Sequence, residues 1–207
     1  MSHTLETRIA WAAEGTGVVT TAVAALGEEE MSAPSVLPGW SRKHVVAHVA
    51  LNAEALGRLT HWARTGEPTP MYVSREQRAA DIEAGAQRPA AELAEWAAAS
   101  AAALADAWAE LTDKQWRAEV VTRGNRTITA DLIPWLRSRE VWIHAVDLGA
   151  DVGFADLPEP FLAALVEEIR DQRDLAELPE GPLPEVAAYL SGRPHALVGV
   201  PDLGAWL

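Results

Sequence analysis

Apolar residues recur at helical spacing along most of the chain. The pattern predicts long helices over about 4–26, 41–63, 89–111 and 131–149. Ser41 and Asp131 suit the N-cap position, and Gly149 suits the end of the last helix. Pro89 and Pro134 fall where the first turn of a helix tolerates proline. Four long helices with connections of unequal length favour a four-helix bundle over an alternating α/β sheet.

The segments between and after these helices predict smaller elements. A short, irregular helix is expected over 74–84. Gly124 and Asn125 lie between two β-prone runs, which is typical of a small hairpin. Beyond residue 150 the predicted elements are two short helices and one strand, over 159–171, 183–190 and 196–200. We therefore predict a mainly α protein, with a four-helix bundle in residues 1–150 and a small α/β C-terminal subdomain in residues 151–207.

Composition and charge narrow the choice of partners. The 207 residues carry a formal net charge of −13, which disfavours nucleic acid and anionic membranes as partners. No apolar run approaches the roughly 20 residues that span a bilayer, and the first residues lack the layout of a secretory signal. A cytoplasmic location is expected. The chain has no cysteine, so metal ligands must be nitrogen or oxygen groups and any thiol must come from another molecule.

Two predicted helices place ionisable side chains on the stripe that faces the core. Glu140 and His144 lie about 40° apart on a helical wheel, one turn along the same helix, and Ile143 shares their stripe. His48 lies in the apolar arc of the helix at 41–63. Burying a carboxylate and two imidazoles without partners is costly, so these groups must meet one another, other polar groups, water or a cation.

A divalent metal ion would satisfy all three groups. Two histidines and one carboxylate leave coordination positions open, as in catalytic sites, and zinc fits this ligand set best. Ferrous iron, nickel and manganese accept the same ligand types. The spacing leaves open a metal-free polar cluster, in which Glu140 is hydrogen-bonded to His48 or His144. It also leaves open whether His44, one turn before His48, replaces that residue, lies at the edge of the site or supports a ligand.

Three stretches of sequence resemble a known family. They run from Leu37 to Ser41, from Val45 to Ala50 and, most specifically, from Arg139 to Gly149. These stretches are similar to the mycothiol-dependent maleylpyruvate isomerase family, and segments 189–193 and 201–206 extend the similarity to the C-terminal part.

The resemblance implies a DinB-like metal-binding bundle with His48, Glu140 and His144 as ligands of a divalent metal, zinc being the expected ion. It implies mycothiol as thiol cofactor or cosubstrate. It also implies a catalytic arginine in the C-terminal part, for which Arg193 is the best match. The planar guanidinium of arginine is suited to binding a carboxylate substrate.

The expected function is therefore a metal- and thiol-dependent isomerisation of a cis double bond, by thiolate addition and elimination. One alternative is a thiol S-transferase that releases the adduct of an electrophilic or specialised metabolite. Another is a metal-binding bundle without catalytic activity. Metal-dependent hydrolysis is a further possibility, for which the sequence indicates no general base.

Overall fold

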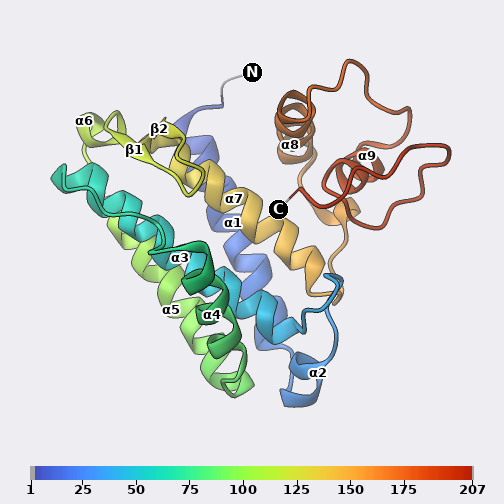
Figure 1. Cartoon of the computed structure of the whole chain (residues 1–207), viewed down its shortest axis with the longest axis horizontal. Helices are drawn as coiled ribbons and strands as arrows, with labels where there is room; N and C mark the ends of the chain where they lie inside the picture. The colour runs from blue at the N-terminus through green and yellow to red at the C-terminus, as the bar shows by residue number, and fades with distance from the viewer. Residues whose placement is uncertain (1–2, 207) are drawn as a thin grey trace. The chain divides into compact units, whose positions relative to one another are not determined.

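The computed structural model describes residues 3–206 and is mostly helical. Four long helices pack around one core, and their most extensive contacts run in the order α1, α7, α3, α5 and back to α1. Helices that follow one another in the chain are therefore not always neighbours in space, and α3 and α7 meet although α5 lies between them in sequence (Figure 1). The bundle helices are α1 (Leu5–Ala24), α3 (Arg42–Thr65), α5 (Ala90–Ala109) and α7 (Ile133–Asp147). The predicted four-helix bundle is confirmed.

Most helix ends lie close to the predicted positions. Ser41 is the N-cap of α3, and the side chain of His44 accepts the backbone N–H of Ser41 at 3.2 Å. Pro134 lies in the first turn of α7, and Gly149, with φ of 62°, follows its last turn. Pro89 lies one position before the expected first turn, because it is the N-cap of α5.

The prediction that Asp131 is an N-cap is wrong. One 3-10 turn, η1 (Ala130–Leu132), precedes α7, and the N-cap of α7 is Leu132. The carboxylate of Asp131 instead accepts a hydrogen bond from Arg8 Nη1 at 2.7 Å, which ties α1 to the start of α7. Long-range pairing of the two side chains replaces local capping.

Shorter elements connect the bundle helices. The predicted hairpin is present as β1 (Glu119–Val121) and β2 (Thr127–Thr129), paired antiparallel with Val120 opposite Ile128. The segment predicted as an irregular helix is a regular one, α4 (Arg75–Ala86), and packs against α3. Two short helices were not predicted, α2 (Glu28–Ser32) and α6 (Asp113–Trp116).

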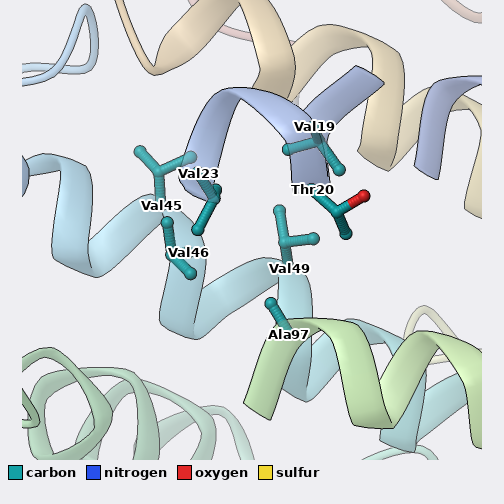
Figure 2. Close-up of a pocket in the computed structure, with 7 residues that line it drawn as sticks. All are labelled: Val19, Thr20, Val23, Val45, Val46, Val49 and Ala97. Atoms are coloured by element: carbon teal, nitrogen blue, oxygen red, sulfur yellow. The ribbon is translucent and has the colours of Figure 1, made fainter. Parts of the chain in front are cut away.

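The bundle is closely packed where α1 meets α7. Gly15 of α1 lies against α7, because a Cβ at this position would be 2.6 Å from the side chain of Val141. Figure 2 shows a small apolar cavity between α1, α3 and α5. Its volume is about 10 Å³, enough for about one water molecule. Its lining residues are Val19, Thr20, Val23, Val45, Val46, Val49 and Ala97. No helix within the described residues is long and apolar enough to cross a bilayer.

The chain divides into two compact units between Ala150 and Asp151. The second unit contains the 3-10 turn η2 (Phe154–Asp156) and the helices α8 (Glu159–Gln172) and α9 (Leu183–Leu190), close to the predicted helical bounds. The predicted strand at 196–200 is wrong, since residues 151–206 form no strand in the described structure. Val198 is 94% exposed and Gly199 has φ of 75°. This segment therefore has neither a partner strand nor an extended backbone throughout.

Candidate metal centre

The structure brings His48 of α3 together with Glu140 and His144 of α7. His48 Nε2 lies 2.8 Å from Glu140 Oε2, and the same oxygen lies 3.3 Å from His144 Nε2. The potential ligand atoms all lie within 4.8 Å of one another. The two imidazole rings are nearly perpendicular, with centroids 4.7 Å apart. Three side chains that the sequence predicted to point inward therefore form one cluster between facing helices.

The cluster is shielded from solvent on most sides. His48 and His144 are each 3% exposed, whereas the side chain of Glu140 is 15% exposed. Trp40 packs beside His48, with ring centroids 5.8 Å apart. The carboxylate is thus the most accessible of the three groups. Low solvent exposure strengthens the electrostatic interactions within the cluster.

Burial and charge change the pKa values of all three side chains. Burial lowers the pKa of His48 to about 4, against the opposing effect of Glu140. Burial also acts to lower the pKa of His144, but hydrogen bonds with Asp147 and Glu140 raise it above its usual value. Burial acts to raise the pKa of Glu140, but the two histidines hold it well below its usual range. Glu140 is therefore a carboxylate at neutral pH, as a metal ligand must be.

Asp147 forms a hydrogen bond with the ring nitrogen of His144 that does not face Glu140. Its Oδ2 lies 2.8 Å from His144 Nδ1, and the residue is fully buried. His144 Nδ1–H therefore donates a hydrogen bond to this carboxylate, and Nε2 faces Glu140. A carboxylate that orients a histidine in this way is typical of metal sites. Together with two imidazole nitrogens and one carboxylate, this arrangement fits a divalent cation such as zinc.

Three further residues near the cluster were not identified from sequence. Arg78 Nη2 lies 3.1 Å from His48 Nδ1, and its guanidinium carbon lies 5.6 Å from the centroid of the Tyr72 ring. Burial raises the pKa of Tyr72, with the charge of Glu140 acting in the same direction. Arg137 lies one turn before Glu140 on α7 and is 1% exposed. The spacing of Arg137 from Glu140 could have identified Arg137 in the sequence as a residue near the cluster. Nothing in the sequence placed α4 or Arg78 beside His48.

Arg137 is a buried cation with incomplete hydrogen bonding. Its Nη1 donates to Val49 O at 2.8 Å and to Asn52 Oδ1 at 2.9 Å, whereas Nε and Nη2 have no partner among the described residues. Burial lowers the pKa of Arg137 to about 10, and the charges of Glu140 and Tyr72 oppose this shift. The guanidinium is still positively charged at neutral pH. The bundle thus holds a fixed positive charge one turn from Glu140.

Of the two other candidates from the sequence, His44 belongs to the same compact unit as the cluster and Arg193 to the other unit. His44 Nδ1 is 2.7 Å from Ser41 Oγ, and its Nε2 is 3.1 Å from Glu83 Oε2, so the side chain caps α3 and pairs with α4. Arg193 belongs to the second compact unit, is 3% exposed and donates from Nη1 to Ser191 O at 2.6 Å. Of the candidates His44 and His48, the structure therefore places His48 with Glu140.

The fold and the cluster together define a DinB-like four-helix bundle with a candidate metal centre. Residues 12–149 match the family model of the mycothiol maleylpyruvate isomerase N-terminal domain. This match covers more than half of the chain. The chain belongs to that family.

Solved structures show the same relationship over a longer span. The chain is 37% identical to the mycothiol-dependent maleylpyruvate isomerase, over 98% of this chain and 97% of that one, with a TM-score of 0.90. A histidine-to-alanine variant of that isomerase matches at 36% identity over the same shares of the chains, with a TM-score of 0.89.

YfiT from Bacillus subtilis, a four-helix bundle of unusual topology, is 17% identical over 70% of this chain and 85% of its own, with a TM-score of 0.55. This likeness supports the fold alone. No curated protein matches the chain.

Proposed function

We propose that this protein is a metal- and mycothiol-dependent isomerase that acts on maleylpyruvate or a closely related cis-unsaturated carboxylate. The observation that carries the proposal is the His48, Glu140 and His144 cluster, in a chain that aligns with the isomerase over nearly its whole length. The similarity extends over both compact units, which favours an enzyme over a non-catalytic metal-binding bundle.

His48, Glu140 and His144 are proposed as the ligands of one divalent cation. A divalent cation held here, which we propose to be zinc, would favour the thiolate form of a bound thiol at neutral pH. The chain has no cysteine, so the nucleophilic sulfur must belong to the cosubstrate. Asp147 keeps the ring of His144 in one orientation, and the rings of His48 and His144 are almost fully buried.

The overall reaction is a reversible addition. The thiolate sulfur would form a bond to one carbon of the cis double bond, and the displaced electron pair would move into the conjugated carbonyl group. Rotation about the resulting single bond, followed by return of the electron pair and expulsion of the thiolate, would give the trans product. The thiol is regenerated in each cycle, so the atoms and electrons of substrate and product balance.

Arg193 is proposed to bind a carboxylate or the developing enolate of the substrate, as the resemblance to the isomerase family implies. A guanidinium can donate two parallel hydrogen bonds to such a group. Arg193 Nη1 donates to Ser191 O, which holds the side chain in a defined orientation. We expect Arg193→Lys to keep the charge but lower turnover, because the ammonium group lacks the planar fork.

The test is an isomerisation assay. Purified, zinc-loaded protein is mixed with maleylpyruvate and a small amount of mycothiol. We expect conversion to the trans isomer with many turnovers per thiol molecule, and loss of activity and of stoichiometric metal in His48→Ala and Glu140→Ala. His61→Gln changes another histidine of α3 outside the cluster and is the matched control, with activity unchanged.

The same assay separates the isomerase from the thiol S-transferase. Consumption of mycothiol in proportion to product would contradict the isomerase and support the transferase. Absence of stoichiometric metal from protein prepared without chelator would refute the metal site itself. The cytoplasmic location stays a prediction.

A further inference from the structure

Arg78 links α4 to the candidate metal centre. It lies near the N-terminal end of α4, and its Nη2 is 3.1 Å from His48 Nδ1. The guanidinium also stacks near the ring of Tyr72, at 5.6 Å from its centroid. Arg78 therefore has one contact with a proposed metal ligand and a second contact that does not depend on that ligand.

The contact with Arg78 determines which nitrogen of His48 carries the proton. A guanidinium can only donate hydrogen bonds, so His48 Nδ1 must be the acceptor. The ring proton then lies on Nε2, from which it is donated to Glu140 Oε2 at 2.8 Å. In this arrangement, the nitrogen that faces Glu140 and His144 has no free lone pair, so it cannot bind a cation.

Binding of a cation by His48 therefore changes the contact with Arg78. The lone pair of Nε2 is needed for the metal, so the ring proton moves to Nδ1 while the total number of ring protons stays the same. Nδ1–H and the guanidinium are then two donors that face each other, and the cation adds electrostatic repulsion. The contact between Arg78 and His48 must break, whereas the contact with Tyr72 can persist.

A metal-loaded centre also has an excess of positive charge. The positive charges of a divalent cation, Arg78 and Arg137 exceed the negative charges of Glu140 and Asp147 by two. Such an excess in a mostly buried site favours anionic ligands. A thiolate supplies one negative charge, and a carboxylate on the substrate supplies the other.

We propose that Arg78 is a substrate-binding residue of the metal centre, which leaves His48 when the metal binds and then holds a carboxylate of the substrate. This inference rests on the proposed function for the identity of the anion as a substrate carboxylate. It assigns the recognition of that carboxylate to the bundle, in addition to the proposed role of Arg193. It also makes carboxylate binding depend on prior metal binding.

The first test measures zinc affinity by competition with a chromophoric chelator. Arg78→Gln removes the charge and offers a carbonyl that can accept from Nδ1–H, so zinc should bind about tenfold or more tightly than in wild type. Arg78→Lys keeps a donor-only cation and should stay within about threefold of wild type. The control is Arg75→Gln, which removes an exposed arginine from the same helix and should have no effect.

The second test measures binding of maleate, a simple dicarboxylate, by calorimetry. Zinc-loaded wild type should bind maleate at least tenfold more tightly than zinc-loaded Arg78→Gln, because a charge-assisted contact is lost. Metal-free wild type should also bind at least tenfold more weakly, whereas Arg75→Gln should match wild type. Circular dichroism and thermal unfolding establish that each variant is folded.

Two results would overturn the inference. One is zinc affinity of Arg78→Gln equal to or weaker than that of wild type, and the other is maleate affinity unaffected by Arg78→Gln. Neither measurement uses mycothiol or turnover. A protein that passes both tests but does not isomerise maleylpyruvate would contradict the proposed function and leave the role of Arg78 intact.

Discussion

Asp147→Asn isolates the contribution of one buried charge to the metal centre. Asparagine has the same shape and can still accept a hydrogen bond from His144 Nδ1, which in the native protein lies 2.8 Å from Asp147 Oδ2. Hydrogen bonds to charged groups contribute about 1.5–3 kcal/mol and neutral ones about 0.5–1.5 kcal/mol. Because Asp147 is fully buried, solvent does not screen the difference. We expect a loss of roughly 1.4 kcal/mol, or about tenfold in zinc affinity.

Zinc affinity of Asp147→Asn is measured by chelator competition at neutral pH, beside Asp106→Asn. Asp106 is an exposed residue of α5, so its variant should bind zinc as wild type does. Unchanged zinc affinity in a folded Asp147→Asn protein would refute the reasoning, because the buried carboxylate would then contribute nothing to His144 as a ligand.

The pH dependence of zinc binding gives a second check on Asp147. His144 must lose its Nε2 proton to bind a cation, and hydrogen bonds with Asp147 and Glu140 raise its pKa in the metal-free protein. Zinc affinity of wild type should therefore begin to fall above pH 6.5 as the pH is lowered. In Asp147→Asn the pKa of His144 is lower, so the fall should begin at lower pH and the two affinity curves should converge in acid.

Three further predictions concern packing, acid stability and the second unit. Gly15→Ala should destabilise the protein by about 1–3 kcal/mol in urea unfolding, because the added Cβ would lie 2.6 Å from Val141. Gly17→Ala, where the Cβ meets nothing within 4 Å, should instead stabilise it by about 1 kcal/mol; equal effects of the two changes would contradict the packing argument.

Burial lowers the pKa of His48 to about 4, below its value in the unfolded chain. In metal-free protein, the resulting contribution to the free energy of unfolding is present in full above pH 6.5 and is lost as the pH falls towards 4. His48→Gln should reduce that acid loss by about 2–3 kcal/mol, measured as the difference between unfolding free energies at the two pH values. Arg193→Lys should lower turnover severalfold with zinc affinity unchanged; a parallel loss of zinc would assign Arg193 a structural role.

The helical part of the fold could be predicted well because its signals are local. Helix caps, prolines in first turns and the glycine after α7 act within a few residues of the chain, and the predicted bounds of α8 and α9 agree closely with the observed ones. The strand predicted at 196–200 failed for the opposite reason. An apolar run becomes a strand only when another strand pairs with it, and within residues 151–206 no partner is present.

The face of α7 that carries the candidate site was harder to distinguish from sequence. Ser138 and Trp142, on the side away from Glu140, are also buried, because they pack against α1. A helix buried on both sides has no polar face that marks the site by contrast. The inward direction of Glu140 and His144 was therefore a correct inference from spacing, but spacing did not say which neighbouring helix they would meet.

What the sequence by itself determined is the separation of groups along each helix. Glu140 and His144 share a stripe because they are four residues apart, and the absence of cysteine requires an external thiol. Helical spacing left His44 and His48 as alternatives, and the family resemblance implied His48. The tertiary structure shows that α3 faces α7, that His48 meets Glu140, and that Arg78 contacts the other side of the His48 ring. These contacts join residues 30 to 92 positions apart. Their formation depends on the packing of whole helices, which no short stretch of sequence encodes.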